Sequence, residues 1–139
     1  MYELTVEAHF DAAHALAGHE GKCRNIHGHR WKVILHVESD TLVEGGTEDG
    51  MIMDFSVLKK KLKEIMNYYD HSLILQEGSV RESTLKALYE EEFLVRVVPF
   101  RPTAENFAKS IFDEIRAAGL PASAVTVYES QCSSATYRE

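Results

Sequence analysis

The feature that most constrains the fold is a pair of long segments in which apolar and polar residues alternate strictly. In the first segment, residues 2–10, every second residue from Tyr2 to Phe10 is apolar. In the second, residues 30–38, the apolar positions run from Trp31 to Val37. Alternation with a period of two places one set of side chains on each face of a β-strand. The segments therefore predict two neighbouring antiparallel strands, each with one buried face.

Apolar residues at helical spacing occur further along the chain. Residues 55–69 carry a clear apolar stripe, and either Asp54 or Ser56 can serve as the N-cap. A second clear stripe begins after Pro102-Thr103 and stops before Gly119. Weaker patterns predict a helix over 83–92, a strand over 93–98 and a last strand over 125–129.

The order of these elements predicts an α+β fold in which helices cover one face of an antiparallel sheet. The sequence contains no internal repeat, linker or low-complexity segment. Residues 1–139 are therefore expected to form a single domain.

Composition excludes several classes of function. The chain has 15 Lys and Arg against 22 Asp and Glu, a formal charge of −7, and no basic tail, so nucleic acid is not an expected partner. It has neither a membrane-length apolar run nor a signal-peptide pattern, which predicts a cytoplasmic protein with no membrane partner. The two cysteines, Cys23 and Cys132, are too few for a disulfide framework and are expected to be free thiols.

Three histidines lie where the two predicted strands meet. His14 follows the first strand, and His27 and His29 precede the second. Each has the parity of its strand's apolar face, so the three side chains are expected to converge at one end of the sheet. A single histidine on an apolar face is more often a hydrogen-bonded core residue. Three converging neutral imidazoles instead suit Zn²⁺, which takes three protein ligands in catalytic sites, so the spacing predicts a catalytic zinc.

Two further side chains extend this candidate site. Cys23 precedes His27 closely, and a cysteine there suits either a fourth ligand of a closed structural zinc site or a thiolate activated by the cation. Spacing alone leaves these two readings open. Glu129 has the parity of Val125 and Val127, which predicts a carboxylate on the buried face that must be paired. A salt bridge to a neighbouring Arg or Lys is the alternative for it.

Several short motifs resemble those of a known family. Together they extend over nearly the whole chain and occur in the same order as in the family. The family is that of the 6-pyruvoyltetrahydropterin and 6-carboxytetrahydropterin synthases. The spacing between Cys23 and His27 looks like the bacterial 6-carboxytetrahydropterin branch. The motifs are residues 10–14 (FDAAH), 23–29 (CRNIHGH), 50–55 (GMIMDF), 70–71 (DH), 102–106 (PTAEN) and Glu129.

The resemblance implies the tunnelling fold, in which sheets from several subunits join into a barrel, as trimers or hexamers with active sites between subunits. It also implies roles for particular residues. These are His14, His27 and His29 as zinc ligands, Cys23 as the catalytic thiol, Asp70 and His71 as an acid/base pair, Glu129 as the anchor of the pterin ring, and Glu105 as a further substrate-binding residue. Because adjacent residues on a strand point apart, Asp70 and His71 must occupy a turn or a strand end to serve one site.

The implied activity is that of a lyase. It converts 7,8-dihydroneopterin triphosphate to 6-carboxy-5,6,7,8-tetrahydropterin and releases acetaldehyde and triphosphate, a step toward queuosine. Alternatives are a 6-pyruvoyl or another cleaved product and, in a different class, a non-catalytic metal- or pterin-binding module. Cys23 and the Asp70-His71 pair argue against the module. Between His71 and Pro102 the chain has an additional segment that compact bacterial members of the family lack. This difference bears on specificity for the side chain of the pterin substrate.

The acidic net charge is unevenly distributed. Between residues 21 and 37 the chain carries Lys22, Arg24, Arg30 and Lys32 and no acidic residue. This segment also holds two of the predicted metal ligands. Its local field is therefore expected to attract a polyanionic substrate.

Overall fold

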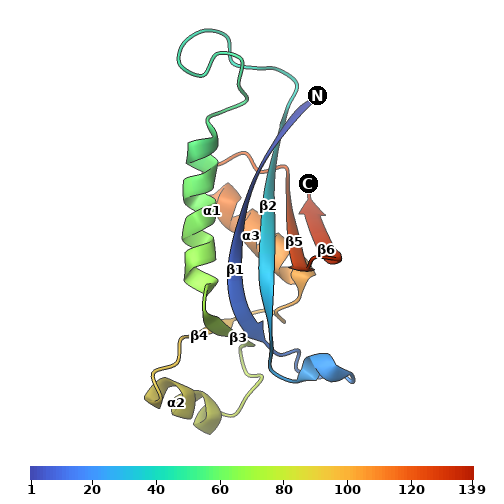
Figure 1. Ribbon diagram of the computed structural model, residues 1–139, viewed down its shortest axis with the longest axis vertical. Coiled ribbons are helices and arrows are strands. Elements are labelled where there is room, and N and C mark those ends of the chain that lie inside the picture. The colour runs from blue at the N-terminus through green and yellow to red at the C-terminus, as the bar shows by residue number, and fades with distance from the viewer.

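A computed structural model describes residues 1–139 and shows the expected hairpin. Strands β1 (Tyr2–His14) and β2 (His27–Ser39) pair antiparallel over their full lengths, with Tyr2 opposite Ser39 and His14 opposite His27 (Figure 1). Both strands are longer than predicted, because backbone pairing continues past the point where the apolar alternation ends. The predicted metal ligands therefore lie on the strands themselves and not beyond them.

The sheet has six strands in the order β4-β3-β1-β2-β5-β6. The last two are β5 (Ala124–Ser130), close to the predicted strand, and β6 (Ser133–Arg138), which the sequence analysis missed. Strand β3 (Ser72–Gln76) was also missed, whereas β4 (Val95–Val98) lies within its predicted range. The predicted antiparallel sheet is confirmed for β1, β2, β5 and β6, whereas at the other edge β3 pairs parallel with both β1 and β4.

Two of the three helices cover one face of the sheet (Figure 1). Helix α1 (Phe55–Tyr69) is capped by the Asp54 carboxylate, which accepts a hydrogen bond of 2.7 Å from the Ser56 amide. Helix α3 (Ala104–Ala117) is capped by Thr103. Helix α2 (Glu82–Glu90) has no buried residue and lies beyond the end of the sheet, so the prediction that helices cover one face holds for α1 and α3 only.

The core lies between the sheet and these two helices and is rich in aromatic rings. Phe10 of β1 stacks on Trp31 of β2, with ring centroids 5.7 Å apart, and Phe107 of α3 meets Trp31 edge-on at 5.2 Å. All three side chains are buried, and so is His14, whose ring meets Trp31 at 4.9 Å. His14 of the candidate site therefore packs directly against the aromatic core.

No helix has both the length and the apolar character that crossing a membrane requires.

Candidate metal centre

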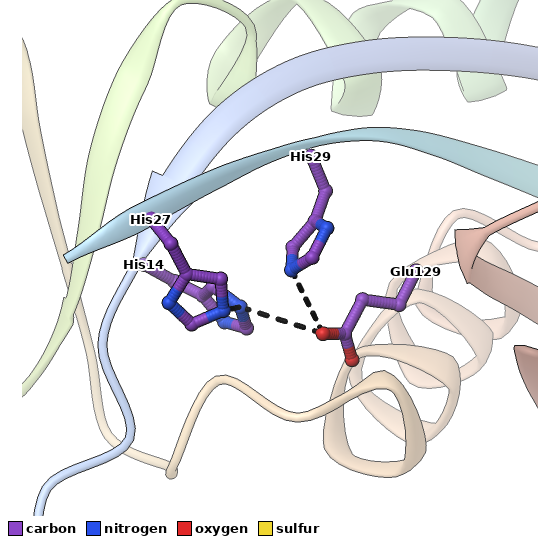
Figure 2. Close-up of side chains that lie close together, drawn as sticks. All are labelled: His14, His27, His29 and Glu129. Carbon is purple, nitrogen blue, oxygen red and sulfur yellow. Dashed lines mark hydrogen bonds and ion pairs between the residues drawn. The ribbon is translucent and has the colours of Figure 1, made fainter. Parts of the chain in front are cut away.

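The three histidines predicted to converge do so on the helix-covered face, at one end of the hairpin. His14 and His27 are direct partners across β1 and β2. His29 lies two residues further along β2, opposite Ala12. The ring centroids of His14 lie 4.5 Å from His27 and 5.2 Å from His29. Figure 2 shows the three rings gathered on one side of the strands, facing Glu129.

Backbone carbonyls fix the tautomers of two of these rings. The Nδ1 atom of His14 donates to the Pro102 carbonyl at 2.7 Å, and Nδ1 of His27 donates to the Asn25 carbonyl at 2.7 Å. A carbonyl oxygen only accepts, so in each neutral ring Nδ1 carries the proton and Nε2 carries a lone pair. The two Nε2 atoms face each other at 3.0 Å. Two lone pairs at this distance repel unless a cation or a proton lies between them.

His29 and Glu129 complete the group. The Nε2 atom of His29 lies 2.8 Å from a carboxylate oxygen of Glu129, and Nε2 of His14 lies 3.8 Å from the same oxygen (Figure 2). The short contact to His29 is not aligned as a hydrogen bond, and its buried Nε2 has no hydrogen-bond partner. The parity argument that placed Glu129 on the buried face is confirmed, and the alternative of a salt bridge to Arg or Lys is not what the structure contains.

These donors fit a metal ion. The donor atoms of His14, His27, His29 and Glu129 all lie within 4.8 Å of one another. With Zn–N bonds of roughly 2.0–2.1 Å, tetrahedral ligands are about 3.3 Å apart, close to the spacing of the facing imidazoles. The outward Nδ1–H···O=C hydrogen bonds are the kind that orient metal-bound imidazoles. The group can therefore hold a metal ion.

Burial disfavours the protonated form of two of the imidazoles, His14 and His29. The pKa of His14 is lowered because desolvation outweighs the carbonyl of Pro102, which acts in the opposite direction. Desolvation also lowers the pKa of His29, more than the neighbouring Glu129 carboxylate raises it. Neutral imidazole is the form that binds metals, so these rings are ready to coordinate near neutral pH.

These lowered pKa values predict acid sensitivity of the metal-free protein. In the unfolded chain both histidines take up protons near the ordinary histidine pKa of 6.5, whereas in the fold the pKa of each is lower and they resist protonation. Their contribution to the free energy of unfolding is complete above pH 6.5 and is lost as pH falls through the lower folded pKa values. We expect a slope of at most about 1.4 kcal/mol per pH unit for each histidine. Urea unfolding in chelator measures it, and a His29→Gln variant with an equally steep slope would contradict the assignment.

The structure does not bring Cys23 into the donor group. Cys23 lies on a short 3₁₀ turn, Lys22–Arg24, where its carbonyl accepts from the Leu16 amide at 2.8 Å. Its thiol is free and half-buried, and Cys132 is free as expected. Glu129 and not Cys23 supplies the fourth potential donor atom. The structure therefore does not support the interpretation of Cys23 as the fourth ligand of a closed zinc site.

Asp70 and His71 form a hydrogen-bonded pair in a turn, as predicted. Asp70 ends α1, and His71 adopts a left-handed φ of 59° before β3 begins. The Asp70 carboxylate accepts from His71 Nδ1 at 2.9 Å and from the Asp11 amide at 2.9 Å. These hydrogen bonds, with that of Asp11 the stronger influence, lower the pKa of Asp70. The carboxylate thus orients an imidazole that is largely exposed to solvent.

His71 is not a member of the donor group of its own chain. It lines a hollow together with Asp11, Ala13, Arg30 and His29, and His29 belongs to the donor group. The structure therefore places the acid/base pair beside the donor group without making it part of that group. Glu129 lies beside the histidines of its own chain.

Glu105 lies in the first turn of α3, is exposed, and is not part of the donor group. Sequence reasoning missed the carbonyls of Pro102 and Asn25 that orient the imidazoles. Backbone oxygens carry no side-chain signature, so only the fold reveals them. The proline of residues 102–106 was nevertheless part of a recognised motif.

The hairpin of this α+β fold carries a three-histidine group that can hold a metal ion, with His14 buried and the other two half-buried. Comparison with known proteins identifies the family. The family model described as 6-pyruvoyl tetrahydropterin synthase matches residues 3–139. The chain therefore belongs to the 6-pyruvoyl tetrahydropterin synthase family and is an enzyme of the lyase class. It is 36% identical to 6-carboxy-5,6,7,8-tetrahydropterin synthase of Haemophilus influenzae over 100% of both chains. It is 38% identical to the Synechocystis enzyme of the same name, over 99% of this chain and 93% of that one.

Solved structures support the fold. An uncharacterized protein from Wolinella succinogenes superposes with a TM-score of 0.77 at 24% identity, covering 99% of this chain and 98% of that chain. The 6-pyruvoyl tetrahydropterin synthase of Caenorhabditis elegans gives a TM-score of 0.67 at 22% identity, covering 100% and 97%. The α+β tunnelling fold expected from the sequence is thus confirmed at the level of the subunit.

Proposed function

We propose that this protein is a zinc-dependent 6-carboxy-5,6,7,8-tetrahydropterin synthase. In this reaction 7,8-dihydroneopterin triphosphate and one water are converted to 6-carboxy-5,6,7,8-tetrahydropterin, with release of acetaldehyde and triphosphate. The observation that carries the proposal is the donor group in which the Nε2 atoms of His14, His27 and His29 gather around one point. The names of the relatives from Haemophilus influenzae and Synechocystis support the carboxy product.

The reaction removes protons beside a carbonyl-like centre, eliminates triphosphate and cleaves a carbon–carbon bond. The site offers the groups that these steps need. A zinc ion on the three histidines would supply Lewis-acid chemistry toward the side-chain hydroxyls of the substrate. Cys23 would accept a proton as thiolate, and His71, held by Asp70, would transfer the second proton. The pair is oriented for this by the 2.9 Å hydrogen bond between the two side chains.

Glu129 would anchor the pterin ring, with Glu105 as a further contact to the substrate. A carboxylate accepts two parallel hydrogen bonds, and the N–H edge and amino group of a pterin supply two donors. Glu129 is well placed because its carboxylate already lies 2.8 Å from His29 Nε2. With Glu129 turned to the pterin, the three histidines leave the fourth position open, as in catalytic zinc sites.

We propose further that the active form is an oligomer, a trimer or hexamer with sites shared between chains. β1 pairs with β3 only over residues 12–14, so the outer edge of the rest of β1 is unpaired, and β6 is the last strand on the other side. Exposed edges of this kind invite pairing with another chain. Sharing would also bring His71 of one chain to the metal centre of another, since His71 is not a member of the donor group of its own chain.

Complementation tests the sharing. Cys23→Ala and His71→Ala are each expected to be inactive as pure oligomers. After mixing and reassembly, random exchange is expected to restore up to about one quarter of the sites, because a site then combines an intact Cys23 with an intact His71. Light scattering that finds a fully active monomer would refute the oligomer. A proven mixed oligomer without any activity would refute the sharing of these two residues.

Product analysis tests the reaction. Incubation with 7,8-dihydroneopterin triphosphate is followed by mass spectrometry of the pterin and by detection of acetaldehyde. We expect the 6-carboxy product with an equal amount of acetaldehyde. A 6-pyruvoyl product without acetaldehyde, or no product at all, would refute the proposed reaction.

A further inference from the structure

An open groove of about 650 Å³ lies among the two packed helices and the edge strand β4. Its volume is in the range of small-molecule sites. The end of α1, strand β4 with the residues that follow it, and one side of α3 form its walls. None of the four metal donors lines the groove, and neither do Cys23, Asp70, His71 or Glu105. The groove is therefore separate from every group assigned to the proposed reaction.

Part of the groove wall is aromatic and is formed by Tyr68, Tyr69 and Phe100. The rings of Tyr69 and Phe100 both meet Phe107 of the core edge-on, at 5.3 and 5.5 Å, so the core holds this wall in place before any ligand binds. The Arg96 guanidinium lies over the Tyr68 ring at 3.9 Å and donates to the Tyr68 carbonyl at 2.7 Å. A planar cation thus already rests on one of these rings. The wall offers apolar surface to a flat ligand and electron-rich rings to a cation.

The part of the wall that α3 forms carries two carboxylates, of which one has no counter-ion. Asp113 is paired with Lys109 at 2.9 Å. The other nearby ammonium, that of Lys61, lies 3.6 Å from Glu64 in an adjoining hollow. Glu114 lines both hollows and has neither an ion pair nor a hydrogen bond. It therefore gives the groove a negative charge that a bound cation would neutralise.

The surroundings of Glu114 strengthen its interaction with a cation. Although the residue as a whole is exposed, its neighbours bury the carboxyl enough to raise its pKa, and the Lys61 ammonium offsets only part of this effect. Burial also raises the pKa of Tyr69 to about 12, with the nearby Glu114 carboxylate adding to the rise. Tyr69 consequently keeps its hydroxyl proton and remains a hydrogen-bond donor. A partly desolvated carboxylate thus lies close to the aromatic wall.

We propose that this groove binds a small organic cation, one that carries an amidinium or guanidinium group on a flat aromatic body. The cationic group would form charge-assisted hydrogen bonds with Glu114, and the flat body would pack against Tyr68, Tyr69 and Phe100. A neutral molecule of the same shape would leave the carboxylate without a counter-ion. The site is independent of the proposed reaction, because it shares no residue with the metal centre or the acid/base pair.

The test is a calorimetric titration of the metal-loaded protein with benzamidine, an aromatic amidinium. We expect a Kd of about 1 mM or tighter for a ligand of this size. Benzamide has the same shape without the charge, and it is expected to bind at least about five-fold more weakly. Both titrations are made on the assembled protein, so that a groove filled by a neighbouring chain would give no binding and would overturn the proposal.

The variant is Glu114→Gln, which keeps the shape of the side chain and removes its charge. We expect it to bind benzamidine at least about five-fold more weakly than the unsubstituted protein. The matched control is Glu44→Gln, which removes an exposed carboxylate from the segment between β2 and α1 and should leave the affinity unchanged. Equal losses in the two variants would attribute the binding to net charge and would contradict a specific site.

The carboxylate of Glu129 is the competing position for an amidinium, so Glu129→Gln is titrated as well. We expect this variant to retain the benzamidine site that Glu114→Gln weakens. Undiminished binding by Glu114→Gln, or equal affinities for benzamide and benzamidine, would overturn the groove. These titrations require no turnover. Failure to form the 6-carboxy product would refute the proposed reaction and leave the groove intact, whereas loss of the groove would leave the reaction untouched.

Discussion

The His27→Ala/His29→Ala variant is expected to lose its metal ion. Two of the three imidazoles that face one another would be gone, and His14 with Glu129 would remain as the only donors. Loss of a single outer-shell partner typically weakens a metal site by about 10–100-fold, so loss of two ligands should exceed that range. We expect the metal content to fall from one ion per chain to near zero and turnover to fall with it.

The fold should survive this change, because His27 and His29 are only partly buried, unlike His14. His19→Ala is the matched control, since His19 is an exposed histidine between the same two strands and outside the donor group. Elemental analysis of the purified proteins gives the result. Full metal retention in the double variant would show that the ion binds elsewhere.

Cys23→Ala is expected to keep its metal and lose turnover. If Cys23 is the base, its removal should lower kcat by about 10²–10⁴-fold, the usual contribution of general base catalysis. The donor group is untouched, because Cys23 is not one of its members. The pair of measurements, metal content and kcat, separates this role from that of a ligand.

The chain contains its own control for this prediction. Cys132 is the only other cysteine, and it is exposed in the turn between β5 and β6. Cys132→Ala should leave both metal content and kcat unchanged. If Cys23→Ala loses its metal, the thiol is a ligand in the working enzyme; if it retains full turnover, another group is the base.

Most of the metal centre could be predicted because it depends on two simple patterns. Alternation fixed which face His14, His27 and His29 occupy, and antiparallel pairing of the same two strands brought them to one end. The parity of Glu129 on β5 then brought its carboxylate to the same place. Each step used only local sequence and the geometry of a strand.

The parts that were missed depend on contacts between distant segments. The Pro102 carbonyl that fixes the tautomer of His14 lies 88 residues away along the chain, and nothing in the local sequence connects the two. Strand β3 lacks alternation because three of its five residues are buried, and β6 is largely polar and exposed. Neither strand has the half-buried pattern by which β1 and β2 were recognised.

The position of His71 is a different kind of result. The sequence predicted its turn and its partner Asp70 correctly, and the structure confirms both. His71 is not a member of the donor group of its own chain, although it lines the same hollow as His29. The proposed oligomer would supply this proton-transfer group from a neighbouring chain.

The central claim is that the histidine group of this chain holds a zinc ion required for turnover of 7,8-dihydroneopterin triphosphate. Its most direct test is to measure product formation before metal removal, after removal by a chelator, and after return of one equivalent of Zn²⁺ per chain. Elemental analysis accompanies each step. The account predicts turnover that disappears with the metal and returns with zinc. Undiminished formation of 6-carboxy-5,6,7,8-tetrahydropterin by the metal-free protein would contradict it.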